Sequence, residues 1–267
     1  MAAPLSLIAG GGRLPFELAR AARQRGHRVI AVGHVGATDP ALEREVDAFT
    51  WVRVGQLKKT VKALAAGGAD RALFGGSLSK AASLARARPD LEAVKLWARL
   101  DRRGDDQLLR VVADWFEKQG FPIVAPVGLL DGCFAELGQV AGPSPKSADL
   151  KEAAWGLRLC RTLGELDIGQ TVAVREGMVL AVEAMEGTDA CIRRAGEIAS
   201  GAIVVKALKP GQDRRFDLPA IGPKTIEVMA KAKAKLLAVE AHATLVIDRA
   251  EVLRLAKKRK ISLVGLG

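Results

Sequence analysis

Short apolar runs and amphipathic segments alternate along the first half of the chain. An apolar run at 4–12 ends in glycines, an amphipathic stretch follows at 14–26, and a second apolar run covers 27–33. This pattern predicts a strand, a helix and a strand. The same rhythm predicts further strands at 49–55, 69–76 and 121–126, and further helices at 56–68, 91–100 and 105–120. Alternation of this kind predicts an α/β fold with a parallel, Rossmann-like sheet.

The rhythm changes where glycine and proline crowd the chain near 128–146. We therefore predict a Rossmann-like N-terminal domain at 1–130, a linker at 131–146 and a mixed α/β C-terminal domain at 147–267.

The C-terminal part opens with a predicted helix at 147–164. Alternating apolar and polar residues at 170–186 then predict two antiparallel strands around a turn at Glu176 and Gly177. A helix follows with Thr188 or Asp189 at its N-cap. The remaining pattern predicts strands at 201–208, 243–248 and 261–267, and helices at 225–241 and 249–260.

Composition narrows the classes of partner. The chain has 267 residues and a net charge of +11, which favours anionic ligands, whether nucleic acid, phosphorylated metabolites or an anionic membrane surface. Aromatic residues make up only 4%, which disfavours a single-strand nucleic-acid binder because such proteins stack bases on aromatic side chains. The three cysteines are far apart in sequence, as expected for buried, reduced thiols of a cytosolic protein.

No apolar stretch is long enough to span a bilayer, and the N-terminal run has neither the basic region nor the length of a signal peptide. We therefore expect a soluble cytoplasmic protein whose membrane contact is peripheral.

A glycine turn at 9–15 separates the first predicted strand from the first helix. Gly10, Gly11 and Gly12 permit close approach of a ligand to the backbone, and a helix N-terminus attracts phosphate. The dinucleotide spacing is absent because Leu14 and Pro15 occupy the end of the motif, and no acid closes the second strand. The turn therefore indicates a phosphate or nucleotide site that is not for NAD, with a purely structural turn as the alternative.

Two further stretches of this half carry candidate polar groups. A second glycine turn at 74–80 holds Gly75, Gly76 and Lys80, which could contact a phosphate or form an ordinary loop. Asp105 and Asp106 begin a predicted helix, and capping alone could explain them.

Acidic residues gather in the C-terminal half. Glu183, Glu186 and Asp189 lie at a strand end and a helix start, where their oxygens could bind Mg²⁺. The N–H groups of Gly187 and Thr188 could bind an oxyanion. The alternative is a capping box with surface acids. Upstream, Asp167 and Gln170 follow a helix without an evident structural need.

The segment 206–222 mixes cations, acids and prolines. Its charged residues are Lys206, Lys209, Asp213, Arg214, Arg215 and Asp217. The segment is either a solvated loop or a site for an anion that also requires an acid, a base or a metal ligand. No Ser-His-Asp order and no nucleophile elbow occurs in the chain, so hydrolase chemistry through a covalent nucleophile has no support. The run at 257–260 is a basic helix end suited to solvent or to acidic head groups.

Five motifs taken together resemble one family along the whole chain. They are "IAGGGRLP", "GDDQLLR", "DIGQTVAV", "VLAVEAMEGTDACIRR" and "KPGQDRRFDLPAIGPKTI". The family is the metal-dependent UDP-2,3-diacylglucosamine pyrophosphatase of lipid A biosynthesis that is unrelated to the metallophosphoesterase version.

The resemblance implies hydrolysis of UDP-2,3-diacylglucosamine to 2,3-diacylglucosamine 1-phosphate (lipid X) and UMP, by attack at the α-phosphorus. It also implies Mg²⁺ as cofactor, a homodimer that exchanges elements, and peripheral contact with the inner leaflet of the inner membrane. The lipid-linked nucleotide sugar would lie between the two domains.

For individual residues, the resemblance makes Asp217 the essential aspartate, as a metal ligand or general base. Glu183, Glu186, Asp189 and Asp213 are the candidate supporting metal ligands. The basic residues of the segment 206–222 would offset phosphate charge. The expected substrate-binding residues are Gly10, Gly11, Gly12, Leu14, Gly75, Gly76, Lys80, Asp105, Asp106, Asp167, Gln170, Gly187, Thr188, Lys206, Lys209, Gln212 and Arg214.

Three other functions stay open at this point. A dinucleotide-dependent Rossmann enzyme predicts NADH binding, and a nucleic-acid binder predicts a steep salt dependence of affinity. A nucleotide-sugar or lipid X binding protein on the same fold would retain the ligand without releasing UMP.

Overall fold

Two compact units make up the chain. A computed structural model describes residues 3–77, 87–98, 105–215 and 218–267, with side chains of the segment after 104 described from residue 108. One unit comprises residues 1–131 with 213–217, and the other comprises 132–212 with 218–267. Among the described residues, no helix combines the length and the apolar character needed to cross a membrane.

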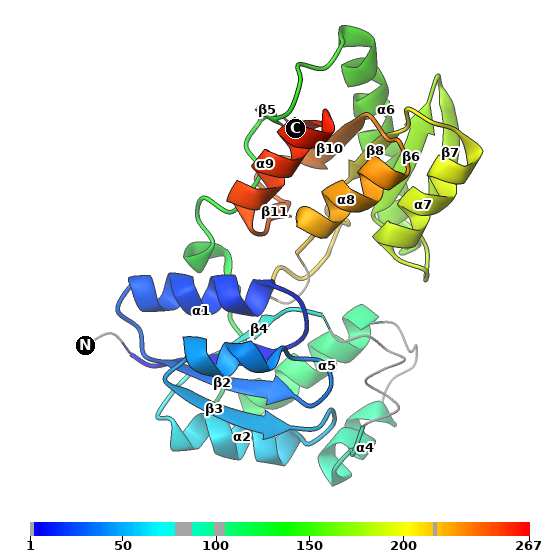
Figure 1. The fold of residues 1–267 in the computed structure, drawn as a ribbon. Coiled ribbons are helices and arrows are strands. Elements are labelled where there is room, and N and C mark those ends of the chain that lie inside the picture. Colours follow the sequence, from blue (N-terminus) through cyan, green and yellow to red (C-terminus); the bar gives the residue numbers. More distant parts are fainter. Residues whose placement is uncertain (1–2, 78–86, 99–104, 216–217) are drawn as a thin grey trace. The chain divides into compact units, whose positions relative to one another are not determined.

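The first unit is built on a parallel sheet in the order β3-β2-β1-β4 (Figure 1). Its strands are β1 (Leu5–Ala9), β2 (Val29–His34), β3 (Ala48–Val52) and β4 (Ala72–Gly75). Its helices are α1 (Leu14–Gln24), α2 (Leu57–Ala66), α4 (Leu91–Trp97) and α5 (Asp105–Lys118), with short 3₁₀ turns at Pro40–Glu45 and Val127–Leu129. The expected Rossmann-like alternation is confirmed.

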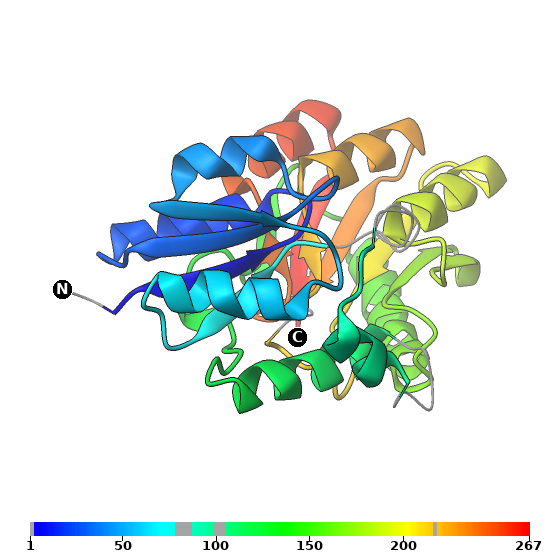
Figure 2. The same cartoon turned by 90° about the horizontal axis from the view of Figure 1, so that it is seen from below.

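Helices cover both faces of this sheet. Along β1, Leu7 lies on the side of α1, where Leu18 packs, whereas Ile8 belongs to the cluster that contains Leu64 of α2 and Phe116 of α5. Figure 2 shows the strands from a second direction, with the cyan helix α2 running along the sheet. Alternate residues of a strand thus point into two different apolar layers, as expected of a sheet that is buried on both sides.

The strand predicted at 121–126 is wrong. Ile123 makes only an isolated parallel bridge to Ala72, with hydrogen bonds from Ala72 N to Pro122 O (3.0 Å) and from Val124 N to Ala72 O (2.9 Å). Proline has no N–H to donate to a ladder, so Pro122 and Pro126 prevent the pairing from extending.

His34 ends β2 as a buried polar residue, 8% exposed. Its Nδ1 lies 2.9 Å from Ala9 O, and the Thr38 hydroxyl donates to the same carbonyl at 2.7 Å. Burial lowers the pKa of His34 below its ordinary value of 6.5, because the charged imidazolium is desolvated. The hydrogen bond to Ala9 acts in the opposite direction and is the smaller effect.

Acid should therefore destabilise the first unit through His34. Because the folded-state pKa is depressed, the unfolded chain binds the proton more readily, so stability is complete above 6.5 and is lost as the pH falls below that value. We expect the protection factors of the β1 and β2 amides, which correct for the intrinsic pH dependence of exchange, to fall as the pH is lowered from about 8 to about 5.5, and His34→Gln to weaken this dependence. His242→Asn, at an exposed site, is the control; an unchanged pH dependence in His34→Gln would contradict the assignment.

The second unit contains a six-stranded mixed sheet in the order β5-β12-β10-β8-β6-β7. Its strands are β5 (Gly138–Ala141), β6 (Thr171–Arg175), β7 (Met178–Val182), β8 (Ile203–Lys206), β10 (Leu236–Glu240) and β12 (Ser262–Leu266). Strands β8, β10 and β12 are parallel, and β5, β6 and β7 are antiparallel to their neighbours. A separate pair joins β9 (Ala220–Ile221) to β11 (Leu245–Val246).

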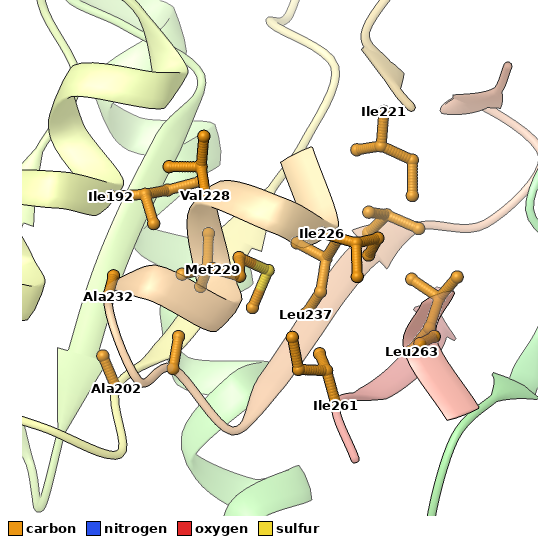
Figure 3. Packing of buried hydrophobic residues seen from close by; sticks show 14 of the residues in the cluster. Ile192, Ala202, Ile221, Ile226, Val228, Met229, Ala232, Leu237, Ile261 and Leu263 are labelled. Carbon is orange, nitrogen blue, oxygen red and sulfur yellow. The ribbon is translucent and has the colours of Figure 1, made fainter. Parts of the chain in front are cut away.

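One helix covers one face of this sheet and three cover the other. Helix α6 (Ser147–Glu165) packs on β6, β8 and β10. The opposite face carries α7 (Thr188–Ile198), α8 (Pro223–Lys231) and α9 (Arg249–Arg259). Figure 3 shows the core between α8 and the sheet, where Ile226 and Met229 lie near Leu237 of β10. Alternate residues of each strand therefore face either α6 or the layer formed by α7, α8 and α9.

Two predictions for this unit are corrected. The segment 131–146 is not simply a linker, since residues 138–141 form strand β5 against β12 and Phe134 bridges to Leu245. The helix predicted at 225–241 ends at Lys231, and residues 236–240 form β10 in the middle of the sheet. Alanine and lysine favour a helix locally, but burial of the apolar run between two parallel strands prevails over that propensity.

The hairpin predicted at 170–186 is confirmed. Strands β6 and β7 pair in antiparallel fashion, and Glu176 and Gly177 both have positive φ, at 53° and 76°. Two such residues make the tight turn that suits a two-residue hairpin. The predicted strands at 201–208 and 261–267 also form, as β8 and β12.

Candidate functional site

Three strand ends meet at one edge of the six-stranded sheet. Thr171, the first residue of β6, lies directly opposite Lys206, the last residue of β8. Glu183 follows the end of β7 and donates its backbone N–H to Thr171 O at 2.9 Å. Because β6 is antiparallel to both neighbours, its beginning is adjacent to both of their ends.

The side chains at this edge form a chain of hydrogen bonds. Lys206 Nζ donates to Thr188 Oγ1 at 3.2 Å and to Ala220 O at 3.1 Å. Thr188 Oγ1 donates to Glu183 Oε1 at 2.9 Å, and Thr171 Oγ1 lies 3.4 Å from the same hydroxyl. We call Glu183, Thr188 and Lys206 the lysine relay.

The two charged residues of the lysine relay are buried, and Thr188 is partly buried. Glu183 and Lys206 are each 7% exposed. Glu183 Oε2 is buried and has no hydrogen-bond partner among the described residues. A buried carboxylate with one unsatisfied oxygen costs stability, so its retention beside a buried ammonium indicates a functional site.

Helix α7 begins at this edge without a side-chain cap. Gly187, at φ 81°, is the N-cap residue, so the expectation of Thr188 or Asp189 at that position is wrong. Thr188 is the first helical residue, and its hydroxyl bonds to Glu183 instead of capping the helix. The first N–H groups of a helix have no intrahelical partner, and they carry the positive end of its dipole. With Lys206 beside them, they can bind an anion.

The segment after β8 is tied to the sheet by Glu240 at the end of β10. Leu208 N donates to Glu240 Oε2 at 2.8 Å, and Arg161 donates to Oε1 at 2.7 Å. Lys209 Nζ then forms an ion pair with Asp167 Oδ1 at 3.0 Å. Two residues of the expected substrate-binding set are thus joined, although Asp167 is largely exposed and such a pair contributes little stability.

Two glutamines near this segment have unsatisfied amide groups. Gln212 Oε1 accepts from Lys209 N at 3.0 Å, but its buried Nε2 has no partner among the described residues. Gln170 Oε1 is likewise buried without a described partner. Both residues belong to the expected substrate-binding set, and an unsatisfied donor and acceptor are what a polar ligand would complete.

Close backbone packing fixes the loop that precedes β6. A Cβ atom on Gly169 would lie 2.0 Å from Glu183 O, so any side chain at this position would push the loop away from the end of β7. Gly169 therefore brings Gln170 next to the lysine relay.

The described carboxylates do not form a metal site by themselves. Glu186 is paired with Arg194 at 2.5 Å, Asp189 with Lys224 at 2.7 Å and Asp213 with Arg215 at 2.7 Å. In the described ranges, no three His, Cys, Asp or Glu side chains are grouped so that they could hold a metal ion. The expected supporting ligands thus do not fit Mg²⁺ without a contribution from elsewhere.

The same pairs set the protonation of two of these acids. The pKa of Glu186 is lowered by its own backbone N–H and by Arg194. The pKa of Asp213 is lowered by its hydrogen bond to the Arg215 guanidinium. Both acids are therefore charged and paired with arginine, which suits ion pairs better than general acids.

Two cysteines of the second unit are buried. Burial raises the pKa of Cys191 to about 12, with the charge of Glu183 adding to the effect. Cys160, on the α6 side, has its pKa raised to about 12 in the same way. Cys133 is partly exposed. The expectation of buried thiols holds for Cys160 and Cys191, whose raised pKa disfavours the nucleophilic thiolate.

The glycines of the first unit pack two turns against each other. Gly10 N donates to Gly75 O and Gly11 N to Ser77 O, both at 2.7 Å. A Cβ on Gly76 would lie 2.4 Å from Gly11 O. Both N–H groups thus donate to backbone carbonyls of the protein itself. The missing side chains of the glycines allow the two turns to pack backbone against backbone. The structural alternative thus accounts for Gly10, Gly11, Gly75 and Gly76, while Gly12 and Leu14 lie where α1 begins.

The comparisons with known proteins follow the same division of the chain. Residues 4–133 match the family model "LpxI N-terminal domain", and residues 136–264 match "LpxI C-terminal domain". A protein of Caulobacter vibrioides named UDP-2,3-diacylglucosamine pyrophosphatase LpxI is 36% identical over 274 residues, covering 98% of this chain and 97% of its own. The chain belongs to the LpxI family.

Solved structures resemble this LpxI family member only distantly. The biotin carboxylase domain of a thermophilic 2-oxoglutarate carboxylase is 14% identical, with a TM-score of 0.28, and 73% of this chain covers 32% of that one. Phosphoribosylglycinamide synthetase from Anaerococcus prevotii is 12% identical, with a TM-score of 0.27, over 69% of this chain and 40% of its own. Likeness this weak supports no statement about function.

Some expected site residues of this LpxI family member fall outside what the structure describes. Lys80 and Asp217 lie outside the described residues. Asp105 and Asp106 open α5, but their side chains are also outside the description. Arg214 is exposed and belongs with Asp213 to the segment grouped with the first unit. The metal and general-base roles of Asp217 stay predictions.

Sequence reasoning missed three groups of the site. Thr171 and the carbonyl of Ala220 both contact the relay, and Glu240 anchors the segment after β8. Thr171 could have been found from the predicted hairpin, because its alternation places Thr171 on the face opposite Val172. Glu240 was hidden inside the wrongly predicted helix.

Proposed function

We propose that this chain hydrolyses the pyrophosphate of UDP-2,3-diacylglucosamine. Water forms a new bond to the α-phosphorus, and the bond from that phosphorus to the bridging oxygen breaks. UMP leaves with the water oxygen, and 2,3-diacylglucosamine 1-phosphate (lipid X) leaves with the bridging oxygen.

The similarity to the Caulobacter vibrioides protein carries this proposal, because 36% identity extends over nearly the full length of both chains. The edge of the second unit supports it physically. A buried lysine lies beside an uncapped helix N-terminus, and together they can offset the charge that develops on a phosphoryl group. The low-dielectric surroundings of Lys206 strengthen that interaction.

Hydrolysis in isotopically labelled water tests the proposal. Purified protein is incubated with UDP-2,3-diacylglucosamine in H₂¹⁸O, and the products are separated by mass spectrometry. The proposal expects UMP that carries the label and lipid X that does not. Label in lipid X would move the attack to the other phosphorus. Tight retention of the lipid without UMP would favour the alternative, a nucleotide-sugar or lipid X binding protein without hydrolysis.

We also propose that turnover requires Mg²⁺, which when bound supplies charge neutralisation and an acidified water. This proposal rests on the family resemblance and on Asp217, since Glu186, Asp189 and Asp213 are each paired with a cation. EDTA should abolish UMP release, and Mg²⁺ added in excess should restore it. Release at the full rate after exhaustive chelation would contradict the requirement.

The partners and location follow from the substrate. A lipid-linked nucleotide sugar has two acyl chains that stay in a membrane leaflet, so we propose peripheral contact with the inner leaflet of the inner membrane from the cytoplasm. The net charge of +11 suits an anionic surface. A homodimer and the absence of nucleic-acid binding stay proposals, and a sedimentation run with and without nucleic acid tests both.

A further inference from the structure

Among the candidate metal ligands of the second unit, Glu183 is the buried acid for which no ion pair and no metal-binding group is found in the described residues. It is 7% exposed, its Oε1 accepts from Thr188, and its Oε2 is unsatisfied among the described residues. The other candidate acids of the second unit, Glu186 and Asp189, are paired with cations. Glu183 is linked to Lys206 through a hydroxyl, since Thr188 bonds to both its carboxylate and the ammonium.

The direction of the hydrogen bonds in the relay is fixed by chemistry. An ammonium can only donate and a carboxylate can only accept, so the hydroxyl between them must accept from Lys206 and donate to Glu183. The single proton of Thr188 Oγ1 is thereby committed to Glu183. The Thr188 hydroxyl therefore cannot donate to a phosphate while the relay is intact, and the expected oxyanion contact of this residue is that of its backbone N–H.

We infer that Glu183 is a positioning residue, which holds the Thr188 hydroxyl and through it the Lys206 ammonium at the open N-terminus of α7. The inference rests on the proposed hydrolysis for its role in turnover. It assigns Glu183 to the protein's own hydrogen-bond network and withdraws it from the candidate metal ligands. Ala220 O provides the second fixed contact of the ammonium, from β9.

The charge of Glu183 has a consequence that a structural role would not have. A carboxylate near an anion site repels the substrate's phosphates in the ground state and in the transition state alike. Its benefit is therefore the orientation of Lys206, which matters most when charge develops during the reaction. Glu183→Gln keeps the size of the side chain and removes its charge, so it should lower kcat without raising KM.

Steady-state kinetics with a double-mutant cycle test this inference. We expect Glu183→Gln to lower kcat by about 10- to 100-fold, as for a misplaced catalytic group. Thr188→Val should lose a similar amount, and Thr188→Ser, which keeps the hydroxyl, should stay near the wild type. Since Glu183 acts through Lys206, adding Glu183→Gln to Lys206→Met should cause no further loss. Exposed Glu165→Gln on α6 is the matched control.

A second measurement separates this inference from the proposed reaction. The ¹⁵N signal of the Lys206 ammonium, assigned by its loss in Lys206→Met, should change in Glu183→Gln and Thr188→Val and persist in Thr188→Ser. A wild-type protein that releases no UMP would overturn the proposed reaction, and the inference would then stand or fall on this signal. An unchanged signal in Glu183→Gln, additive kinetic losses or a dominant rise in KM would overturn the inference.

Discussion

Replacing Asp217 by alanine should abolish UMP release while the protein stays folded. Asp217 stands in "FDLPAIG", the stretch of the sequence in which the family resemblance places its essential aspartate. The other candidate acids are already engaged: Glu186, Asp189 and Asp213 are held in ion pairs, and Glu183 accepts from Thr188. Loss of a general base or of the metal ligand that activates water costs about 10²- to 10⁴-fold in rate.

The measurement is single-turnover release of UMP, with the melting temperature and lipid binding recorded on the same sample. Asp131→Ala removes a carboxylate that is largely exposed and serves as the matched control. Asp217→Asn should be as inactive as Asp217→Ala, because it keeps the shape and loses the charge. Near-normal turnover in either variant would remove Asp217 from the mechanism.

Replacing Lys206 by methionine should have the second-largest effect. The ammonium is the buried cation beside the open N-terminus of α7, and an oriented donor of this kind contributes about 10²- to 10³-fold to the rate. The substitution keeps most of the apolar stem and removes the charge. It also removes the donor to the Thr188 hydroxyl and to Ala220 O in a buried network, so the unfolding free energy should fall by about 1–3 kcal/mol.

The two effects of Lys206→Met can be separated by temperature. Activity is measured well below the lowered melting temperature, where the variant is fully folded, and circular dichroism confirms the fold. Lys151→Met removes the same charge from an exposed position of α6 and should leave both properties unchanged. If Lys206→Met loses stability but retains the rate, Lys206 has a structural role only.

Local sequence patterns were sufficient to predict an element wherever the neighbours of a segment in sequence are also its neighbours in space. The β6–β7 hairpin follows from alternation and from a two-residue turn, both of which are local. The N-terminal strands and helices follow from runs that end in glycine. The prediction of one helix at 225–241 was wrong because β10 is defined by its pairing with β8 and β12, which lie far away in the chain.

The candidate site also has features that the sequence predicts and features that only the fold decides. Residue type and order identify the family motifs, the basic segment after β8 and the acids around α7, because these properties are written in the chain itself. They do not tell which acid meets which cation. Glu186, Asp189 and Asp213 look equivalent to Glu183 in the sequence, yet folding pairs the first three with Arg194, Lys224 and Arg215.

The chain's composition and motifs thus determine its family, its fold class and the kind of anion that its basic segment suits. The partner of each charge is decided by tertiary structure, because the register of β6 against β8 brings Thr171 opposite Lys206 and the packing of α7 brings Thr188 between Lys206 and Glu183. Electrostatic and hydrogen-bond energies depend on distances of a few ångströms and on burial, and both arise only when strands from distant parts of the sequence pair.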